Sequence, residues 1–395
     1  MTSEWHEVPL RELVGYISKG IAPSYAEEAS ETTIRVLNQK CNRNFRISYG
    51  DSRLHDTLKK KVPPERYVKP DDILINSTGA GTAGRIAQIE DVPSATTIDG
   101  HMTLIRSNGK VTQKFLGYAL KAHQWEVLQL DEGSTGQTEL NRDRLLDEIV
   151  INYPVSFDEQ NAIVGTLESI DRKLIVNEQL NDNLQQQAFS VFDNLIANAE
   201  NNDYTLSDYA FLNPKRTLAK NQVARSIDMS QLSTSGAFPS GWEMKPFNGG
   251  MRFTNGDTLL ARITPCLENG KTAFIDFLDD GEVAFGSTEY IVLAPKNDTP
   301  PEMLYCLARY PAFVDYAVKN MNGSSGRQRV SAETVGQYRL PLFDKHSLVL
   351  FKEVVSPMFL KMRYNSLENM RLAELRDALL PKLMSGEIDV SAVQL

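Results

Sequence analysis

The sequence contains little cysteine and no long apolar run. Only three of its 395 residues are cysteines, and Cys41, Cys266 and Cys306 lie far apart. This spacing predicts neither a disulfide framework nor a Cys-x-x-Cys metal site. No apolar run reaches the roughly 18 to 20 residues that a membrane-spanning helix needs, and residues 1–5 lack the basic and apolar segments of a signal peptide. We therefore expect a cytoplasmic protein.

Motifs for catalysis are also lacking. Residues 79–84 match the glycine spacing of a dinucleotide site, but residues 85–91 look like a strand instead of the required helix. Asp257, Glu268 and Lys271 are residue types of a metal-dependent nuclease, but a separation of three does not place Glu268 and Lys271 on one face of a strand. The five histidines form no metal spacing, and no Walker or Ser/His/Asp pattern is present. We interpret the chain as a binding module without catalytic residues, metal or cofactor of its own.

The charge distribution favours one segment as a nucleic-acid surface. The net charge of −9 argues against phosphate binding by the chain as a whole. Residues 35–69, however, carry ten Lys or Arg against three Asp or Glu, a local balance of +7, with aromatic residues interleaved. Such a mixture is typical of a surface that meets a polyanion, although a solvated charged face has the same composition.

An internal repeat organises the chain. Three segments of the first half return in the second, namely 72–75 as 257–260, 84–89 as 270–275, and 133–136 as 323–326. Each copy contains short apolar runs broken by turn residues, with helical patterns near 112–128 and 300–320. The repeat therefore predicts two mixed α/β (α+β) domains in a chain of this length.

Each copy ends in a long helical pattern. Ser156 and Glu159 have the spacing of a capping box, and apolar residues follow at alternating steps of four and three. Adding 188 to these positions reproduces the second pattern, including a pair of asparagines in each helix: Asn177, Asn181, Asn365 and Asn369. Asparagine at a helix seam fixes the register of a coiled coil.

We predict an antiparallel coiled coil with pseudo-twofold symmetry that acts as a spacer of about 60 Å. The alternative is two core helices in separate domains. Pro381 is expected to hinder the second helix, and Gly386 to form a later turn.

The whole arrangement resembles the specificity subunit of Type I restriction-modification enzymes. The resemblance rests on the domain–helix repeat and on five segments: 70–75, 256–260, 133–137, 323–327 and the closing 375–388. It implies a first target-recognition domain at 1–154, a spacer helix at 155–200, a second recognition domain at 201–342, and a second helix with its tail at 343–395. The entries into both helices depart from the family pattern, most clearly at 340–346, which affects helix boundaries.

The same resemblance implies that each domain reads one half of a split double-stranded DNA target while the helices set the gap. It also implies methyltransferase subunits that bind S-adenosylmethionine and restriction subunits that hydrolyse ATP with Mg. Two alternatives stay open: a specificity protein of a related phage-defence system, and a coiled-coil scaffold that does not read DNA.

Base reading favours polar and basic side chains near the repeated loops. The candidates in the first copy are Arg43, Arg46, Lys59, Lys60, Lys61, Ser77, Thr78, Arg85 and Gln137. Those in the second copy are Lys215, Arg216, Arg262, Lys271, Arg327, Gln328 and Arg329.

Overall fold

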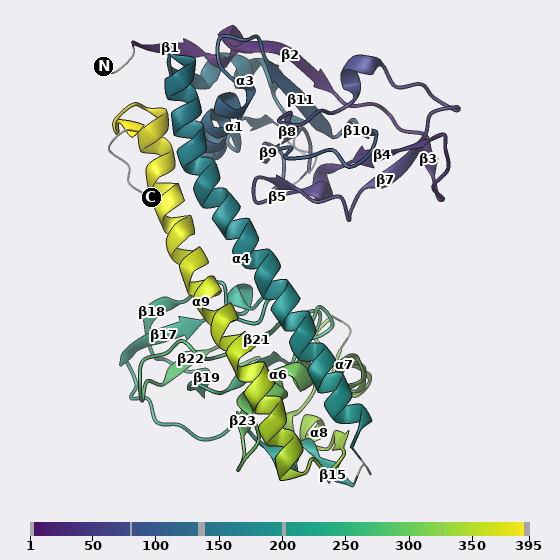
Figure 1. Cartoon of the computed structure of the whole chain (residues 1–395), viewed down its shortest axis with the longest axis vertical. Coiled ribbons are helices and arrows are strands. Elements are labelled where there is room, and N and C mark those ends of the chain that lie inside the picture. The colour runs from purple at the N-terminus through teal and green to yellow at the C-terminus, as the bar shows by residue number, and fades with distance from the viewer. Residues whose placement is uncertain (1–3, 80, 133–138, 200–202, 325, 391–395) are drawn as a thin grey trace. The chain divides into compact units, whose positions relative to one another are not determined.

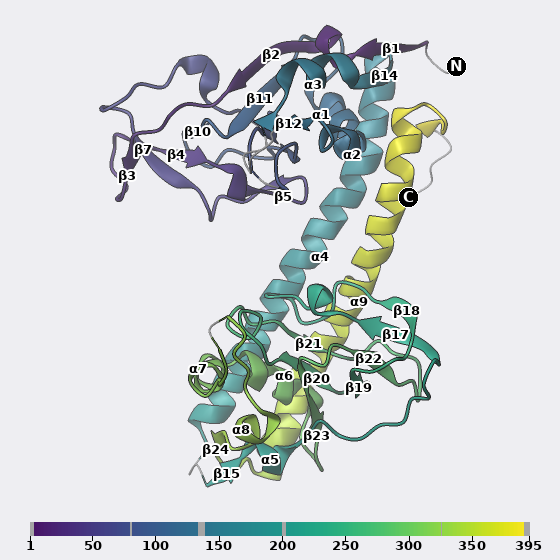
Figure 2. The same ribbon diagram turned by 180° about the vertical axis from the view of Figure 1, so that it is seen from behind.

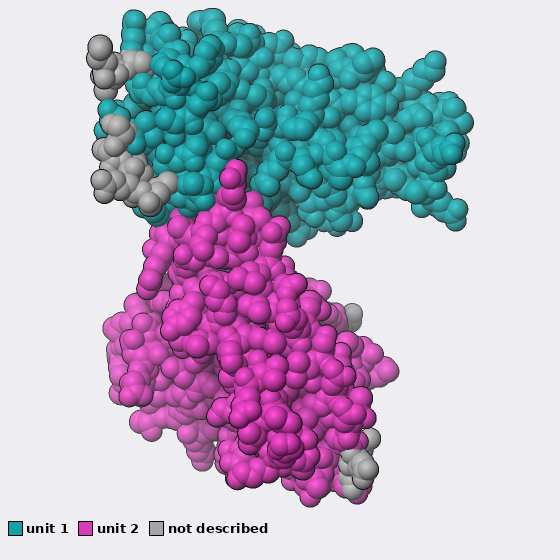
Figure 3. Space-filling view, viewed as in Figure 1, with its two compact units in different colours: residues 1–171, 375–395 teal, residues 172–374 magenta. Residues whose placement is uncertain are grey.

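The computed structural model describes residues 4–79, 81–132, 139–199, 203–324 and 326–390. The chain divides into two compact units (Figure 3), unit 1 with residues 1–171 and 375–395 and unit 2 with residues 172–374. The two longest helices, α4 (Phe157–Ala197) and α9 (Lys345–Met384), each contribute residues to both units. No helix in the described ranges is long and apolar enough to span a membrane.

Unit 1 contains two four-stranded sheets (Figure 1). Its central sheet is antiparallel and has the order β2 (Val14–Lys19), β11 (Met102–Ser107), β8 (Ile73–Asn76), β9 (Ile86–Gln88). The second sheet has the order β10 (Thr96–Ile98), β4 (Thr33–Leu37), β7 (Arg53–Asp56), β3 (Tyr25–Ala26). Three strand pairs complete the unit, β1 (Trp5–Pro9) with β14 (Val150–Pro154), β5 (Asn42–Arg43) with β6 (Arg46–Ile47), and β12 (Asp131–Glu132) with β13 (Glu139–Leu140). Its short helices are α1 (Gln113–Ala122), α2 (Gln124–Val127) and α3 (Arg142–Glu148).

Unit 2 repeats this plan (Figure 2). Its central sheet, with the order β16 (Ala210–Leu212), β23 (Tyr290–Pro295), β20 (Thr258–Ala261), β21 (Thr272–Phe274), has the same antiparallel pairings. The second sheet has the order β18 (Glu243–Pro246), β17 (Val223–Ile227), β22 (Ala284–Gly286), β19 (Met251–Phe253), and β15 (Tyr204–Thr205) pairs with β24 (Arg339–Leu340). Its short helices are α5 (Leu206–Tyr209), α6 (Pro301–Arg309), α7 (Pro311–Lys319) and α8 (Ala332–Gly336). The predicted repeat of two mixed α/β domains is confirmed.

Both long helices begin at side-chain caps. The Ser156 hydroxyl accepts a hydrogen bond from the Glu159 amide at 3.4 Å, and the Asp344 carboxylate accepts one from the Ser347 amide at 3.0 Å. Adding 188 to the numbers of the first cap gives the second, as the sequence predicted for the helices. Because a cap satisfies amides that have no partner within the helix, it fixes where each helix starts.

The long helices pack antiparallel within unit 2. The Asn177 amide donates to Asn369 Oδ1 at 2.8 Å, and the Asn365 amide donates to Asn181 Oδ1 at the same distance. Adding 188 to 177 gives 365, and subtracting 188 from 369 gives 181, so the first contact maps onto the second. The two contacts of this asparagine layer are therefore related by a local twofold axis. The predicted antiparallel coiled coil is confirmed, and two helices buried in separate domains are excluded. That the asparagines fix the register stays a prediction.

The expectation that Pro381 hinders α9 was wrong. The helix continues to Met384, and the Pro381 carbonyl accepts a hydrogen bond from the Ser385 amide at 3.0 Å. Proline removes one donor, but Leu380, Leu383 and Met384 are buried in the core of unit 1 and their burial outweighs that loss. Gly386 then adopts a φ of +74°, as expected of a turn residue.

Candidate nucleic-acid interface

In unit 1, three segments meet at the end of β8. The Ser77 amide donates to the His101 carbonyl at 2.8 Å, and the Leu140 amide donates to the Ser77 carbonyl at 2.8 Å. The Thr78 hydroxyl lies 2.7 Å from His101 Nδ1. We call residues 76–78, 85, 101 and 139–140 edge 1.

Unit 2 builds an equivalent edge at the end of β20. The Arg262 amide donates to the Glu289 carbonyl at 3.0 Å, and the Val330 amide donates to the Arg262 carbonyl at 3.0 Å. These bonds correspond to those of edge 1. Arg262 follows β20 as Ser77 follows β8, and Glu289 and Val330 lie 188 and 190 residues after His101 and Leu140. We call residues 261–263, 271, 289 and 327–330 edge 2.

The two edges differ in charge. In edge 2 the Glu289 carboxylate accepts hydrogen bonds from Arg329 Nε at 2.9 Å and Nη2 at 2.7 Å, and Arg262 Nε lies 3.8 Å away. The Arg329 hydrogen bonds hold the pKa of Glu289 below its ordinary value, so the carboxylate is ionised at neutral pH. The Arg329 side chain stays 38% exposed. Arg329 Nη1 also donates to the Arg327 carbonyl at 3.1 Å, so the carboxylate and this carbonyl orient a guanidinium that keeps one N–H on each Nη for a base or phosphate.

In edge 1 the residue that corresponds to Glu289 is His101, and the carboxylate of this edge, Glu139, forms an ion pair with Lys19. Asn42 donates to the Arg85 carbonyl at 2.8 Å and to Asn76 Oδ1 at 3.2 Å, which brings the β5–β6 hairpin to the edge. Arg43 follows directly and is exposed, as is Arg85, whose Nη2 donates to the Gly81 carbonyl at 3.2 Å. One basic residue of the positively charged segment, Arg43, therefore lies next to the polar groups of edge 1.

The remaining first-copy candidates are either buried in the fold or lie away from edge 1. Ser77 is 1% exposed and its hydroxyl is 2.6 Å from Thr103 Oγ1, so it holds the fold together and we leave it out of the interface. Residues 59–61 are exposed in the turn after β7, where Lys60 Nζ donates to the Ala22 carbonyl at 2.8 Å. Arg46 is half-buried in β6. Gln137 lies outside the described residues.

Two second-copy candidates have structural partners. Arg216 donates to the buried carboxylate of Asp257 at 2.7 Å, and Lys271 Nζ donates to the Met229 carbonyl at 2.7 Å. We leave Arg216 out of the interface because it compensates a charge that is only 1% exposed. Lys215 and Arg327 are exposed and Gln328 is half-buried.

Sequence reasoning missed three polar residues at the edges, Asn42, His101 and Glu289. No motif marks them. For His101 and Glu289 the available signal was the repeat. Glu289 lies 188 residues after His101, and each residue directly precedes an inner strand of its central sheet, β11 or β23. In the described ranges, no group of three or more His, Cys, Asp or Glu residues is placed to hold a metal ion.

Comparison with known proteins agrees with this architecture. A family model described as the Type I restriction modification DNA specificity domain matches residues 2–186. The specificity subunits of the Type I restriction enzymes EcoAI and EcoEI of Escherichia coli are 34% and 30% identical over 133 and 143 residues, which are 32% and 35% of this chain. These matches span 22% and 24% of the two relatives, less than a quarter of either.

The fold is shared over a greater length. The crystal structure of the Type I restriction-modification S subunit from M. genitalium superposes with a TM-score of 0.58 at 16% identity, covering 97% of this chain and 96% of that one. At this identity the likeness concerns the fold alone. The resemblance to specificity subunits is confirmed: residues 2–186 match the Type I restriction modification DNA specificity domain, and the chain shares the fold of a Type I S subunit along nearly its whole length.

Proposed function

We propose that this chain is the DNA sequence-specificity subunit of a Type I restriction-modification complex and that edges 1 and 2 each read one half of a split target. The observation that carries the proposal is the duplicated edge. The same three segments meet at the end of the same strand in both units, and polar or basic side chains border each meeting point. A duplicated reading surface suits a target of two halves.

The chemistry of the edges suits base reading in the major groove. Arginine recognises guanine through two parallel hydrogen bonds, and a good bidentate contact contributes about 1 to 3 kcal/mol of discrimination. Edge 2 offers Arg329 and Arg327, whereas edge 1 offers Thr78, His101 and Arg85, with Arg43 beside it. Different groups at equivalent places would give two different half-sites.

The helix pair would set the gap between the half-sites. α4 has 41 residues and α9 has 40, so each is about 60 Å long at 1.5 Å per residue. Each helix also contributes buried residues to the cores of both units. A helix that enters both cores is a suitable spacer because neither end can slide without disrupting packing.

Catalysis would lie in partner chains. In this proposal the protein is not an enzyme and acts in the cytoplasm on double-stranded DNA, together with methyltransferase subunits that bind S-adenosylmethionine and restriction subunits that use ATP and Mg. The acidic total charge of −9 fits such a complex, because partners can supply contacts to the DNA phosphates.

The test is to co-express the chain with the methyltransferase encoded beside it and to map methylated bases by single-molecule sequencing. A split motif with two defined halves is the expected result. A folded complex without methylation or DNA affinity would favour the scaffold function, and methylation at an unsplit motif would contradict the role of two edges.

A further inference from the structure

A buried carboxylate of unit 2 has an oxygen without a hydrogen-bond partner. Glu302, in the first turn of α6, is 8% exposed, and its Oε2 atom accepts no hydrogen bond from the described residues. The three other carboxylates buried in the described ranges each accept one, Asp72 and Asp257 from an arginine and Asp99 from a backbone amide. Because an ionised carboxylate is costly to bury alone, Glu302 requires a cation or a proton.

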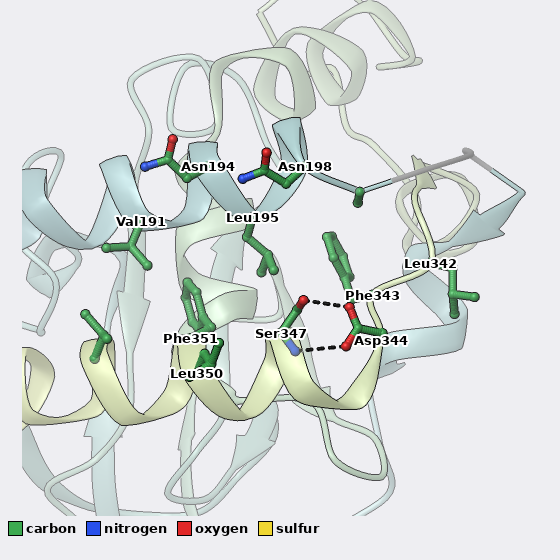
Figure 4. Close-up of a pocket in the computed structure, with 12 residues that line it drawn as sticks. Val191, Asn194, Leu195, Asn198, Leu342, Phe343, Asp344, Ser347, Leu350 and Phe351 are labelled. Atoms are coloured by element: carbon green, nitrogen blue, oxygen red, sulfur yellow. Dashed lines mark hydrogen bonds between the residues drawn. The ribbon is translucent and has the colours of Figure 1, made fainter.

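The equivalent positions of unit 1 form an ion pair. The cap that starts α9, shown in Figure 4, lies 188 residues after the cap that starts α4. By the same offset, Glu302 of α6 corresponds to Lys114 of α1, and Ser356 of α9 corresponds to Glu168 of α4. Lys114 Nζ donates to Glu168 Oε1 at 2.7 Å. Unit 1 therefore joins its short and long helices by opposite charges, whereas unit 2 has a carboxylate and a serine at these positions.

The serine also has an oxygen without a partner. Ser356 Oγ is buried and forms no hydrogen bond with the described residues. Three residues further along each helix, Tyr305 of α6 and Phe359 of α9 pack edge to face with ring centroids 5.5 Å apart, so the two helices are in contact here. Buried polar atoms are almost always hydrogen-bonded. Two unpartnered oxygens at the places of an ion pair therefore point to a bound group between α6 and α9.

The strand beside α6 contributes a third oxygen of this kind. Thr258 of β20 is fully buried, and its Oγ1 has no partner among the described residues. Alternation along the strand places Thr258 on the same face as Leu260, which belongs to the core that α6 joins. Two residues before Thr258, a Cβ atom added to Gly256 would lie 3.8 Å from Pro301 Cγ at the start of α6. This segment of the sheet thus borders the first turn of α6.

The charges around this place leave one negative charge without a partner. Asp276, just after β21, accepts a hydrogen bond from Arg363 of α9 at 3.1 Å, so these two charges balance. Burial raises the pKa of Asp276, Arg363 opposes the rise, and the charge of Glu302 adds to it, which indicates that Glu302 is close by. The start of α6 favours an anion, but it gives Glu302 Oε2 no hydrogen bond. The charge that remains is that of Glu302.

We propose that Glu302, Ser356 and Thr258 bind a monovalent alkali cation, K⁺ or Na⁺. Oxygen atoms are the ligands that hard cations prefer, and a single positive charge neutralises Glu302 without exceeding it. The site lacks the His, Cys, Asp and Glu cluster of a divalent metal, because the described ranges contain no such group of three. The ion joins α6 to α9 as the Lys114–Glu168 pair joins α1 to α4. This site does not depend on DNA reading.

The test is hydrogen exchange of the full chain at neutral pH, with KCl or NaCl replacing tetramethylammonium chloride at constant ionic strength. The large tetramethylammonium ion screens charges equally but cannot enter a buried site. We expect the amides of α6 to exchange more slowly as the alkali salt increases, by about tenfold when its concentration is about ten times Kd. Equal exchange in all three salts would overturn the site. Exchange that ignores alkali ions but slows at acidic pH would assign a proton to Glu302 instead.

Two variants of the chain locate the ion. Glu302→Gln removes the charge and should abolish the dependence on alkali salt. Ser356→Lys supplies an ammonium group and should restore the ion pair of unit 1 in reverse, so that α6 exchanges about threefold or more slowly without alkali salt and no longer responds to it. Glu333→Gln, which removes an exposed carboxylate from the first turn of α8, is the matched control and should keep the dependence. A dependence that persists in Glu302→Gln would overturn the proposal even if Ser356→Lys fails to fold.

Discussion

The central sheets of the two units have the same strand order and pairings, whereas the second sheets differ at their borders. In unit 1 the strands β10, β4 and β7 are joined by β3 beside β7; in unit 2 the corresponding β22, β17 and β18 are joined by β19 beside β22. The fourth strand thus lies on opposite flanks. The repeat therefore preserves the central sheets, which position the edges, while the second sheets beside them have diverged.

A buried aspartate shows the same divergence at the level of one interaction. Asp72 and Asp257 occupy equivalent positions, and each accepts the amide of the residue three places earlier, at 2.7 and 2.8 Å. Arg106 of β11 compensates Asp72, whereas Arg216, which follows β16, compensates Asp257. A buried carboxylate requires a cation, but the segment that provides it is free to change.

The largest effect is expected from lengthening the spacer. Inserting one heptad after Asp171 and another after Glu374 leaves the contacts within each unit intact and adds about 10 Å of helix. The preferred gap of the target should change by about three base pairs, at roughly 3.4 Å per base pair, while both half-sites stay the same. Methylome sequencing of the co-expressed complex measures this, and an unchanged gap would contradict the spacer role.

Trp5→Ala tests a contact within unit 1, where the Trp5 indole N–H donates to Glu159 Oε1 at 3.3 Å and the ring lies against Gly386. The free energy of unfolding should fall by about 3 kcal/mol, the low end for loss of a packed aromatic, because Trp5 is only half-buried. Urea denaturation with hydrogen exchange should locate the loss in unit 1. The matched control is Trp125→Ala, which removes a side chain that is 74% exposed and should change stability by less than about 0.5 kcal/mol. Equal losses in the two variants would show that Trp5 is not a packing residue.

Arg329→Ala tests whether edge 2 reads only its own half-site. Preference for the second half-site over a scrambled sequence should fall by about 1 to 3 kcal/mol, while the first half-site is unaffected. His101→Ala, in edge 1 of unit 1, should have the reverse pattern. Competition binding with DNA carrying one scrambled half at a time measures both. An equal loss on every sequence would mean that Arg329 contacts only phosphate.

We expect the smallest effect in the pH dependence of the stability of unit 2. Burial raises the pKa of Asp257 to about 6, and hydrogen bonds from Thr254 and Arg216 oppose this rise. A carboxyl group with a raised folded-state pKa favours the folded state when protonated, so its contribution is lost as the pH rises from about 4 to about 6. Asp257→Asn should flatten the decline in stability over this window. Urea midpoints at pH 4, 5 and 6 would reveal it, and an identical slope in the variant would contradict the raised pKa.

Local patterns made the repeat and the helices predictable. Periodicity, capping residues and the constant offset between the copies lie within short windows, so α4, α9 and the asparagine positions could be read from the sequence. The strand order and the convergence at each edge depend on pairings between residues far apart, such as Ser77 with Leu140, and no local pattern encodes them. The same limit applies to single residues. Nothing near Arg216 indicates that Asp257 uses it, and nothing near Ser77 indicates that Thr103 covers it.

The asparagine layer of α4 and α9 is self-complementary. Asn177 meets Asn369 as Asn365 meets Asn181, so each helix presents to the other the donor and acceptor that it receives. A shorter protein with one globular copy and one such helix would find the same amide partners on a second molecule of itself. The present chain can thus be understood as the covalent fusion of a homodimer, and once the two copies were joined, each edge was free to acquire side chains that the other does not share.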